Sequence, residues 1–187
     1  LRMREHLGLM RDAGCRSLWI GVEDITGTLV NKGQGKDKTA EAFRLLRDAG
    51  ICPMPMMMHH DSQPLLTRGS DYGLLNQVRL LRKAGAVSLQ ALMITPSAGS
   101  KLFEETYTSG QVYDRVGGRP VEPRMYDGNY VIASGHPRPW KKQLNLLTAY
   151  LYFYNPLRLL VALVRRKSKV GLKPAGMQVI GMLGLVH

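Results

Sequence analysis

The chain has 187 residues, of which 44% are hydrophobic, a length and composition that fit roughly one folded domain. Its two cysteines, Cys15 and Cys52, form no CxxC-type spacing, so the cysteines of this chain cannot by themselves build a zinc or iron–sulfur site. Neither do they suggest a disulfide framework, and a reduced, cytoplasmic setting is the default expectation.

The formal net charge of +12 is unevenly distributed along the chain. No acidic residue follows Asp127, and residues 128–187 contribute +9 of the net charge. The positive charge therefore belongs mainly to the C-terminal third, which is expected to meet an anionic partner or to present a solvated basic surface.

One pattern occurs three times in the first hundred residues: a helical stretch that ends in Ala-Gly, a short apolar run and then a polar break. Its glycines are Gly14, Gly50 and Gly85, a period of 35 to 36 residues. Apolar residues recur at three-to-four spacing over residues 38–48 and 74–81, which predicts amphipathic helices. The glycines then stand where a helix commonly ends in the left-handed region.

The apolar runs that follow the glycines cover residues 17–24, 53–58 and 87–94. They are short and nearly continuous, which favours parallel strands covered on both faces. Helices alternating with such strands predict an α/β fold, either an open sheet or a β/α barrel. In both architectures the functional residues gather at the carboxyl ends of the strands.

Polar residues stand at each of the three expected strand ends: Glu23-Asp24, His59-His60-Asp61 and Thr95-Pro96-Ser97. We favour a ligand-binding role for Glu23 and expect Asp24 to cap the next helix. Because neighbouring side chains of a strand point in opposite directions, at most one of His59 and His60 faces a ligand squarely. A histidine hydrogen-bonded within the protein is preferred there to a metal ligand.

The C-terminal segment is predicted to be mainly helical. Residues 140–154 form one helix, Asn155 and Pro156 begin a second over residues 157–166, and Ser100 caps an earlier helix at Lys101. The span 144–164 has about bilayer length, but its internal polar residues favour an interfacial position over a spanning helix.

Two interpretations of this tail remain open. Residues 140–173 contact an anionic membrane, which would place the protein at the inner face of the membrane, or the leucines pack on the rest of the protein and the cations are solvated. Nucleic acid is not an expected partner on this pattern, because the cations are not interleaved with a recognised binding fold.

Two phrases, together with the Ala49-Gly50-Ile51 run between them, resemble radical S-adenosylmethionine (SAM) enzymes in order and spacing. Ile20-Gly21-Val22-Glu23, followed by Asn31-Lys32-Gly33, resembles the family's fourth-strand phrase, and residues 94–102 resemble the phrase after its sixth strand. The branch it is most similar to carries an N-terminal cobalamin-binding domain. The resemblance covers about residues 5 to 130.

The resemblance implies that residues 1–125 are the C-terminal half, strands four to six, of a partial (β/α)6 TIM-like barrel, and that residues 126–187 are a post-barrel extension and basic tail. It implies a 4Fe-4S cluster and SAM as cofactors, with cobalamin as a further one, and methyl transfer or rearrangement of a small-molecule or lipid-like substrate. Glu23, Thr95 and Ser97 would contact SAM, and His59, His60 and Asp61 would lie on the substrate side.

The chain also departs from the family pattern. The CxxxCxxC loop that holds the cluster is missing, so no cluster ligand is expected among these residues and the chain is expected to be an inactive fragment of a longer enzyme. Residues 59–64 replace the family's fifth-strand Gly-x-Pro-Gly-Glu. The alternative is a noncatalytic α/β module that its basic tail docks to a membrane or to an acidic partner.

Overall fold

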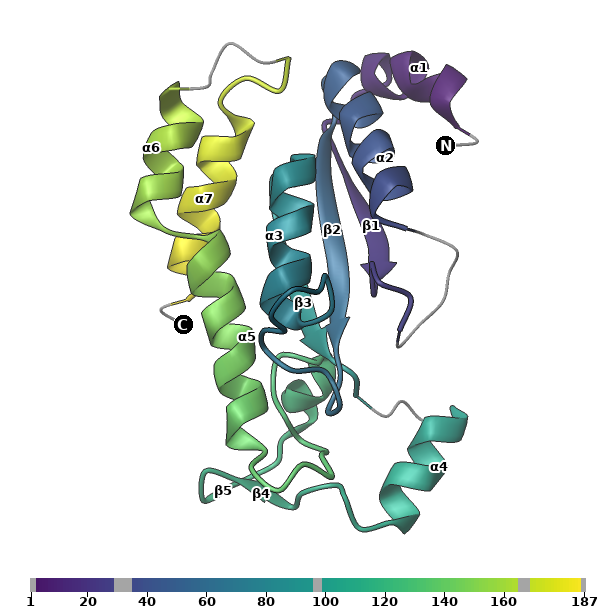
Figure 1. Ribbon diagram of the computed structural model, residues 1–187, viewed down its shortest axis with the longest axis vertical. Coiled ribbons are helices and arrows are strands. Elements are labelled where there is room, and N and C mark those ends of the chain that lie inside the picture. Colours follow the sequence, from purple (N-terminus) through teal and green to yellow (C-terminus); the bar gives the residue numbers. More distant parts are fainter. Residues whose placement is uncertain (1–2, 29–34, 96–98, 165–168, 186–187) are drawn as a thin grey trace.

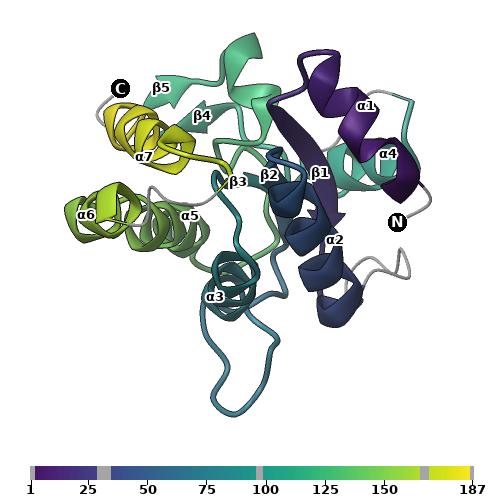
Figure 2. The same cartoon turned by 90° about the horizontal axis from the view of Figure 1, so that it is seen from above.

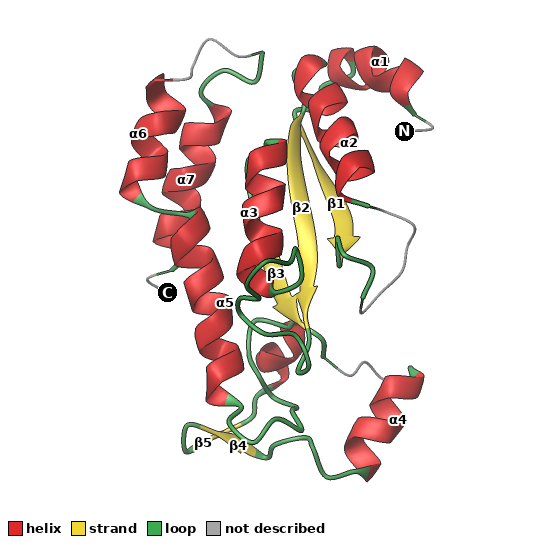
Figure 3. Cartoon of the chain, in the orientation of Figure 1, coloured by secondary structure: helices red, strands yellow, loops and turns green. Residues whose placement is uncertain are grey.

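A parallel sheet of three strands, in the order β1-β2-β3, lies at the centre of the molecule (Figure 1). The computed structural model describes residues 3–28, 35–95, 99–164 and 169–185. The strands are β1 (Ser17–Glu23), β2 (Cys52–His59) and β3 (Gln90–Met93). They alternate with helices α2 (Lys36–Asp48) and α3 (Leu74–Ala84), as Figure 3 shows, and this confirms the predicted α/β class.

The three repeated glycines end or follow the helices as predicted. Gly14, Gly50 and Gly85 have φ values of +99°, +82° and +101°, a region that glycine enters at little cost. Each leads within a few residues into the next strand. The remaining short elements are η1 (Arg4–His6), α1 (Leu7–Asp12), α4 (Lys101–Thr108), β4 (Arg115–Val116), β5 (Arg119–Pro120) and η2 (Pro123–Asp127).

The two faces of the sheet differ in their burial. Helices α2 and α3 cover one face (Figure 2), where Val22, Met57 and Ala91 are almost fully buried. On the opposite face Trp19 is 48% exposed, and Met56 is only half-buried. Among the described residues the second face is therefore covered only in part, because α2 and α3 pack on the same side.

The outer edge of β3 is closed by tyrosine side chains from α5 (Trp140–Phe153) and the residue that follows it. The Tyr150 hydroxyl bonds the Ala91 N–H and C=O at 3.0 and 2.9 Å, and the Tyr154 hydroxyl bonds those of Leu89 at 2.7 and 3.0 Å. These hydroxyls occupy the backbone groups with which a further strand would pair.

The C-terminal segment forms three helices: α5, α6 (Pro156–Val164) and α7 (Lys173–Leu183). Asn155 caps α6, its Oδ1 accepting from the Arg158 N–H at 3.1 Å, as predicted. The Ser100 Oγ likewise accepts from the Phe103 N–H at 3.2 Å at the start of α4. Helices α6 and α7 pack side by side in both views (Figures 1 and 2).

Helix α5 belongs to the same hydrophobic core as the sheet. Leu146, Ala149 and Phe153 are buried in one cluster with residues of β1, β2, β3, α2 and α3. By length and composition alone, the described stretch Trp140–Val164 could cross a membrane. The helix is interrupted there, since Tyr154 has an extended backbone conformation and α6 begins at Pro156.

Candidate functional site

The carboxyl ends of β2 and β3 border a cavity of about 70 Å³. Its walls include all three residues predicted for the substrate side. The lining residues are His59, His60, Asp61, Met93, Ile94, Thr106, Gln111, Ala133 and Ser134. The strand ends and the segment before α5 therefore form one site.

His59 is fully buried and uses both ring nitrogens inside the protein. Its Nδ1 lies 2.7 Å from Gln63 Oε1, and its Nε2 lies 3.2 Å from Asn145 Nδ2. Since an amide oxygen only accepts, Nδ1 carries the proton and Nε2 accepts from Asn145. Burial is the main cause that lowers the pKa of His59 to about 4, so the ring is neutral at pH 7.

A buried lysine from α5 lies beside this histidine. The Lys142 side chain donates from Nζ to the Gln63 carbonyl oxygen at 2.9 Å, and the residue is 4% exposed. Burial lowers the pKa of Lys142, while the Asp61 carboxylate opposes that change. A buried lysine, a neutral histidine and a carboxylate thus meet at the end of β2, the kind of cluster that marks candidate sites.

Asp61 connects the end of β2 to the chain before α5. Its carboxylate oxygens accept from Ser134 Oγ at 2.7 Å and from the Gly135 N–H at 2.8 Å. His60 differs from His59, because its Nδ1 accepts from the Ser62 N–H at 3.1 Å while its Nε2 has no hydrogen-bond partner among the described residues. His60 Nε2–H is consequently the imidazole donor that remains available to a ligand in the cavity.

Glu23 ends β1 with an unusual backbone. Its φ is +58°, the one positive value among the described residues other than glycine, and the pairing with β2 shifts between Gly21 and Glu23. Positive φ costs energy for a residue with a Cβ and is enriched at functional sites. The prediction that Glu23 binds a ligand has this conformational support, and it stays a prediction.

Asp24 does not cap the next helix, which corrects the sequence-based expectation. Helix α2 begins after Gly35, with no side-chain cap. Asp24 is instead buried, and its Oδ1 accepts from the Thr26 N–H at 3.0 Å and from Gln77 Nε2 at 2.7 Å. The Asp24 carboxylate therefore attaches the turn that follows β1 to helix α3.

Thr95 lies at the end of β3, where its Oγ1 donates to the Met93 carbonyl at 3.3 Å. Ser97 lies outside the described residues, as do Asn31, Lys32 and Gly33. The predicted contacts of Thr95 and Ser97 with SAM remain predictions.

The described residues do not fit the cofactors that the resemblance implies. Cys15 and Cys52 stand at the amino ends of β1 and β2, and no group of three or more His, Cys, Asp or Glu residues among the described ones could hold a metal ion. The cavity of about 70 Å³ is also far smaller than the roughly 300–1,000 Å³ typical of small-molecule pockets. These residues alone enclose neither an iron–sulfur cluster nor SAM.

Sequence reasoning missed the residues that hold this site together: Gln63, Gln77, Ser134, Lys142 and Asn145. One signal was available for Lys142, which stands four residues before Leu146 on the buried stripe of α5. A cation at a core position of an amphipathic helix must find a buried acceptor. Gln77 stands out in the same way between the buried Leu74 and Leu81 of α3.

Comparison with known proteins identifies no relative. No family model matches the chain, and neither the curated proteins nor the solved structures give a significant match.

Proposed function

We propose that this chain is the C-terminal half of a partial β/α barrel in a radical SAM enzyme, with cobalamin as a further cofactor that the resemblance suggests. The cluster would reduce SAM and so start radical chemistry on a small-molecule or lipid-like substrate. The support comes from the two phrases at residues 20–33 and 94–102 with the run between them, and from the architecture that carries them.

One observation carries the proposal: the two edges of the sheet are not alike. At β3, tyrosine hydroxyls occupy the outer backbone groups of Leu89 and Ala91. Among the described residues no strand pairs with the outer edge of β1. Further strands can therefore join at β1 and not at β3, which is the arrangement required if these strands are the last three of an open barrel.

The half-exposed face of the sheet gives a second support. A parallel sheet is normally buried on both faces, yet Trp19, Met56 and Leu92 are exposed or only half-buried on the face opposite α2 and α3. In a barrel this face would be the interior, and additional strands would cover it. Exposed apolar surface of this kind is usually buried against another part of a protein or a partner, here the additional strands.

Within the proposal, the residues at the carboxyl ends act in binding and positioning. Glu23 would accept hydrogen bonds from a bound nucleoside or amine, and Thr95 would add a hydroxyl. His60 would donate from Nε2 to a substrate, while His59 and Asp61 hold the walls in place. No cluster ligand comes from these residues, so the proposal requires cysteines from outside the 187 residues.

The first test is the coding sequence that precedes the codon for Leu1. The proposal expects it to encode a CxxxCxxC loop within one or two strands, and the absence of that loop would remove the radical SAM assignment. The longer protein, prepared without oxygen and supplied with iron and sulfide, should then show the spectrum of a 4Fe-4S cluster and convert SAM to 5′-deoxyadenosine after reduction.

Glu23 gives a residue-level test in the same longer protein. The Glu23→Gln variant should bind SAM at least about tenfold more weakly, because a hydrogen bond to a charged group is worth roughly 1.5–3 kcal/mol. Glu41→Gln, a change of the same kind on the exposed side of α2, is the matched control and should bind normally. Equal SAM affinity in both variants would withdraw the role of Glu23.

A second candidate function, a noncatalytic module docked to a membrane, rests on the exposed apolar residues of the tail. On α5, Leu144, Leu147 and Leu151 are 49%, 42% and 52% exposed and recur at three-to-four spacing, so they share one face. Leu157 and Leu160 of α6 are 66% and 59% exposed. A basic segment with such a face suits the surface of an anionic bilayer.

Sedimentation with vesicles of phosphatidylcholine and phosphatidylglycerol in equal amounts tests this candidate. The 187-residue chain should sediment with them, and Leu144→Gln/Leu151→Gln should reduce binding at least about tenfold, since burying one leucine is worth about 1.5–3 kcal/mol. Leu9→Gln/Leu66→Gln, which alters exposed leucines outside the tail, should sediment like the unaltered chain. Binding that is absent, or insensitive to the first variant, removes the membrane as a partner.

A further inference from the structure

A second cavity lies at the opposite, amino-terminal end of the sheet. It has a volume of about 150 Å³ and is bordered by α2, the turn from α3 to β3, α6 and α7. Its lining includes Arg47, Arg82 and Arg158, together with the apolar residues Val87, Val161 and Pro174. One bound water requires about 10–15 Å³, so this space can hold a polyatomic group.

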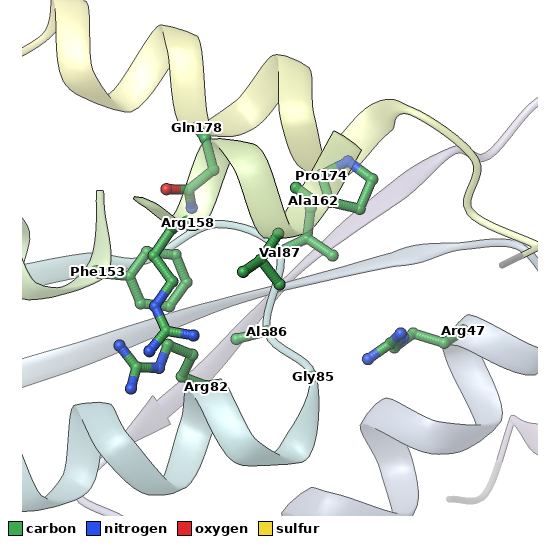
Figure 4. Close-up of a pocket in the computed structure, with 11 residues that line it drawn as sticks. Arg47, Arg82, Gly85, Ala86, Val87, Phe153, Arg158, Ala162, Pro174 and Gln178 are labelled. Atoms are coloured by element: carbon green, nitrogen blue, oxygen red, sulfur yellow. The ribbon is translucent and has the colours of Figure 1, made fainter. Parts of the chain in front are cut away.

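Three arginines from three different helices line this cavity (Figure 4). Arg82 of α3 and Arg158 of α6 lie next to each other, and Arg47 of α2 points toward the cavity from the other side. The Arg47 guanidinium lies directly against Gly85, where a Cβ would collide with it. A glycine at this turn therefore leaves room for the Arg47 side chain.

The positive charge of the cavity has no counterion in the described structure. No Asp or Glu is among the described lining residues, and the side chains of Arg47 and Arg158 have no hydrogen-bond or ion-pair partner there. Burial lowers the pKa of Arg82, and the Arg158 and Arg79 cations act in the same direction. Three half-buried like charges around one cavity repel one another unless an anion joins them.

Arg82 is held in place by a neighbour. Its guanidinium donates to the Tyr152 hydroxyl and, at 3.3 Å, to the Tyr152 carbonyl, and it stacks 3.8 Å from the centre of the Tyr152 ring. A guanidinium fixed on an aromatic ring keeps further N–H groups for a ligand. Gln178, which is buried, accepts from the Asn155 N–H at 3.4 Å, so its amide nitrogen adds a donor.

We propose that this cavity binds a phosphate group through Arg47, Arg82 and Arg158. Planar guanidinium groups match phosphate oxygens in paired hydrogen bonds, and a phosphate offers enough oxygens and charge for three such groups at once. A carboxylate, with two oxygens and a single charge, serves them less well. The apolar wall made by Val87, Val161 and Pro174 leaves space for the carbon part of a phosphorylated ligand.

This inference is independent of the function proposed above. The cavity lined by Arg47, Arg82 and Arg158, here called the arginine cavity, lies at the amino-terminal end of the sheet. Glu23, His60 and Asp61 stand instead at the carboxyl ends of the strands. Failure of phosphate binding would leave the radical SAM proposal unaffected. Absence of a CxxxCxxC loop or of SAM cleavage would likewise leave the phosphate proposal unaffected.

Calorimetric titration of the 187-residue chain with inorganic phosphate, at ionic strength kept constant with sodium chloride, tests the site. Binding is expected in the unaltered chain and should weaken at least about tenfold in Arg158→Gln and in Arg47→Gln. Arg44→Gln is the matched control, because Arg44 lies on the exposed side of α2 in an ion pair with Asp48. Its phosphate affinity should stay within about twofold of that of the unaltered chain.

Two variants keep the test valid if one of them fails to fold, which circular dichroism would reveal. Absence of phosphate binding, or equal affinity in the unaltered chain and both cavity variants, would overturn the proposal. Titration with soluble dihexanoyl phosphatidic acid then distinguishes the source of the phosphate. Affinity at least tenfold above that of inorganic phosphate and lost in Arg158→Gln supports a lipid headgroup, and affinity similar to inorganic phosphate supports a small phosphorylated ligand.

Discussion

The buried imidazole of His59 should make the stability of this protein depend on pH. Burial lowers the pKa of His59 in the folded state to about 4, from 6.5 for an exposed histidine. The Lys142 cation acts in the same direction, and the Gln63 hydrogen bond and the Asp61 charge oppose it. Between pH 4 and 6.5 the unfolded chain therefore binds a proton that the folded chain does not.

The sign and size of the effect follow from this difference. Because the unfolded state binds more protons in that window, the free energy of unfolding falls as the pH decreases through it. From pH 7.5 to pH 5, the loss assigned to His59 is about 2 kcal/mol. Below pH 4 both states carry the proton and the loss reaches its limit.

Urea unfolding followed by circular dichroism, at pH 7.5 and pH 5, measures this loss. In His59→Gln, which cannot titrate, the difference between the two pH values should be about 2 kcal/mol smaller than in the unaltered protein. Met57→Leu, a change at a buried residue of the same strand that removes no titratable group, serves as the control and should keep the pH dependence of the unaltered protein. If His59→Gln shows the same pH dependence as the unaltered protein, His59 is not a buried neutral histidine and the reasoning fails.

The packing of the C-terminal helices supports two further predictions. Tyr154→Phe removes the hydroxyl that bonds the buried backbone of Leu89 and should lower the free energy of unfolding by roughly 2 kcal/mol or more in urea titrations, whereas Tyr130→Phe, at an exposed tyrosine, should change it little. Gly181 of α7 lies against the Tyr154 ring, so Gly181→Ala should destabilise by about 1–3 kcal/mol and lower the Tm. Gly176→Ala, on the same helix with open space around it, should instead stabilise by about 0.5–1 kcal/mol, and equal effects of the two changes would contradict the packing of α7 on Tyr154.

The repeated units could be predicted because each depends on neighbours in sequence. Helix periodicity over residues 38–48 and 74–81, and the glycines that follow, predict where α2 and α3 end and, within about one residue, where β2 begins, whereas β3 begins at Gln90, three residues after the start of the expected run. A short connection between a helix and a strand favours a parallel crossover, so the α/β class follows from local pattern. The cap that Asn155 gives α6 is local in the same sense.

The candidate site could be predicted only in part, because its contacts join residues far apart in sequence. The position of His59, His60 and Asp61 at a strand end was predictable, but Asn145 and Ser134, their partners, come from segments more than seventy residues away. The role of Asp24 could not be predicted for the same reason. A local cap is the usual partner of such a carboxylate, whereas Gln77 of α3 is its partner in the structure.

Helix α5 connects the two ends of the sheet, which have different chemistry. Near its start, Lys142 and Asn145 contact Gln63 and His59 at the carboxyl ends of the strands. At its last residue, Phe153 forms part of the arginine cavity at the amino-terminal end. The Tyr150 hydroxyl bonds Ala91 between these points, and the Tyr154 hydroxyl bonds Leu89 just after the end of α5. These bonds hold α5 in register with the sheet, and the positions of both cavities therefore depend on them. A change that shifts α5 along β3 is therefore expected to alter both sites, whereas a change at Arg47 should affect the arginine cavity alone.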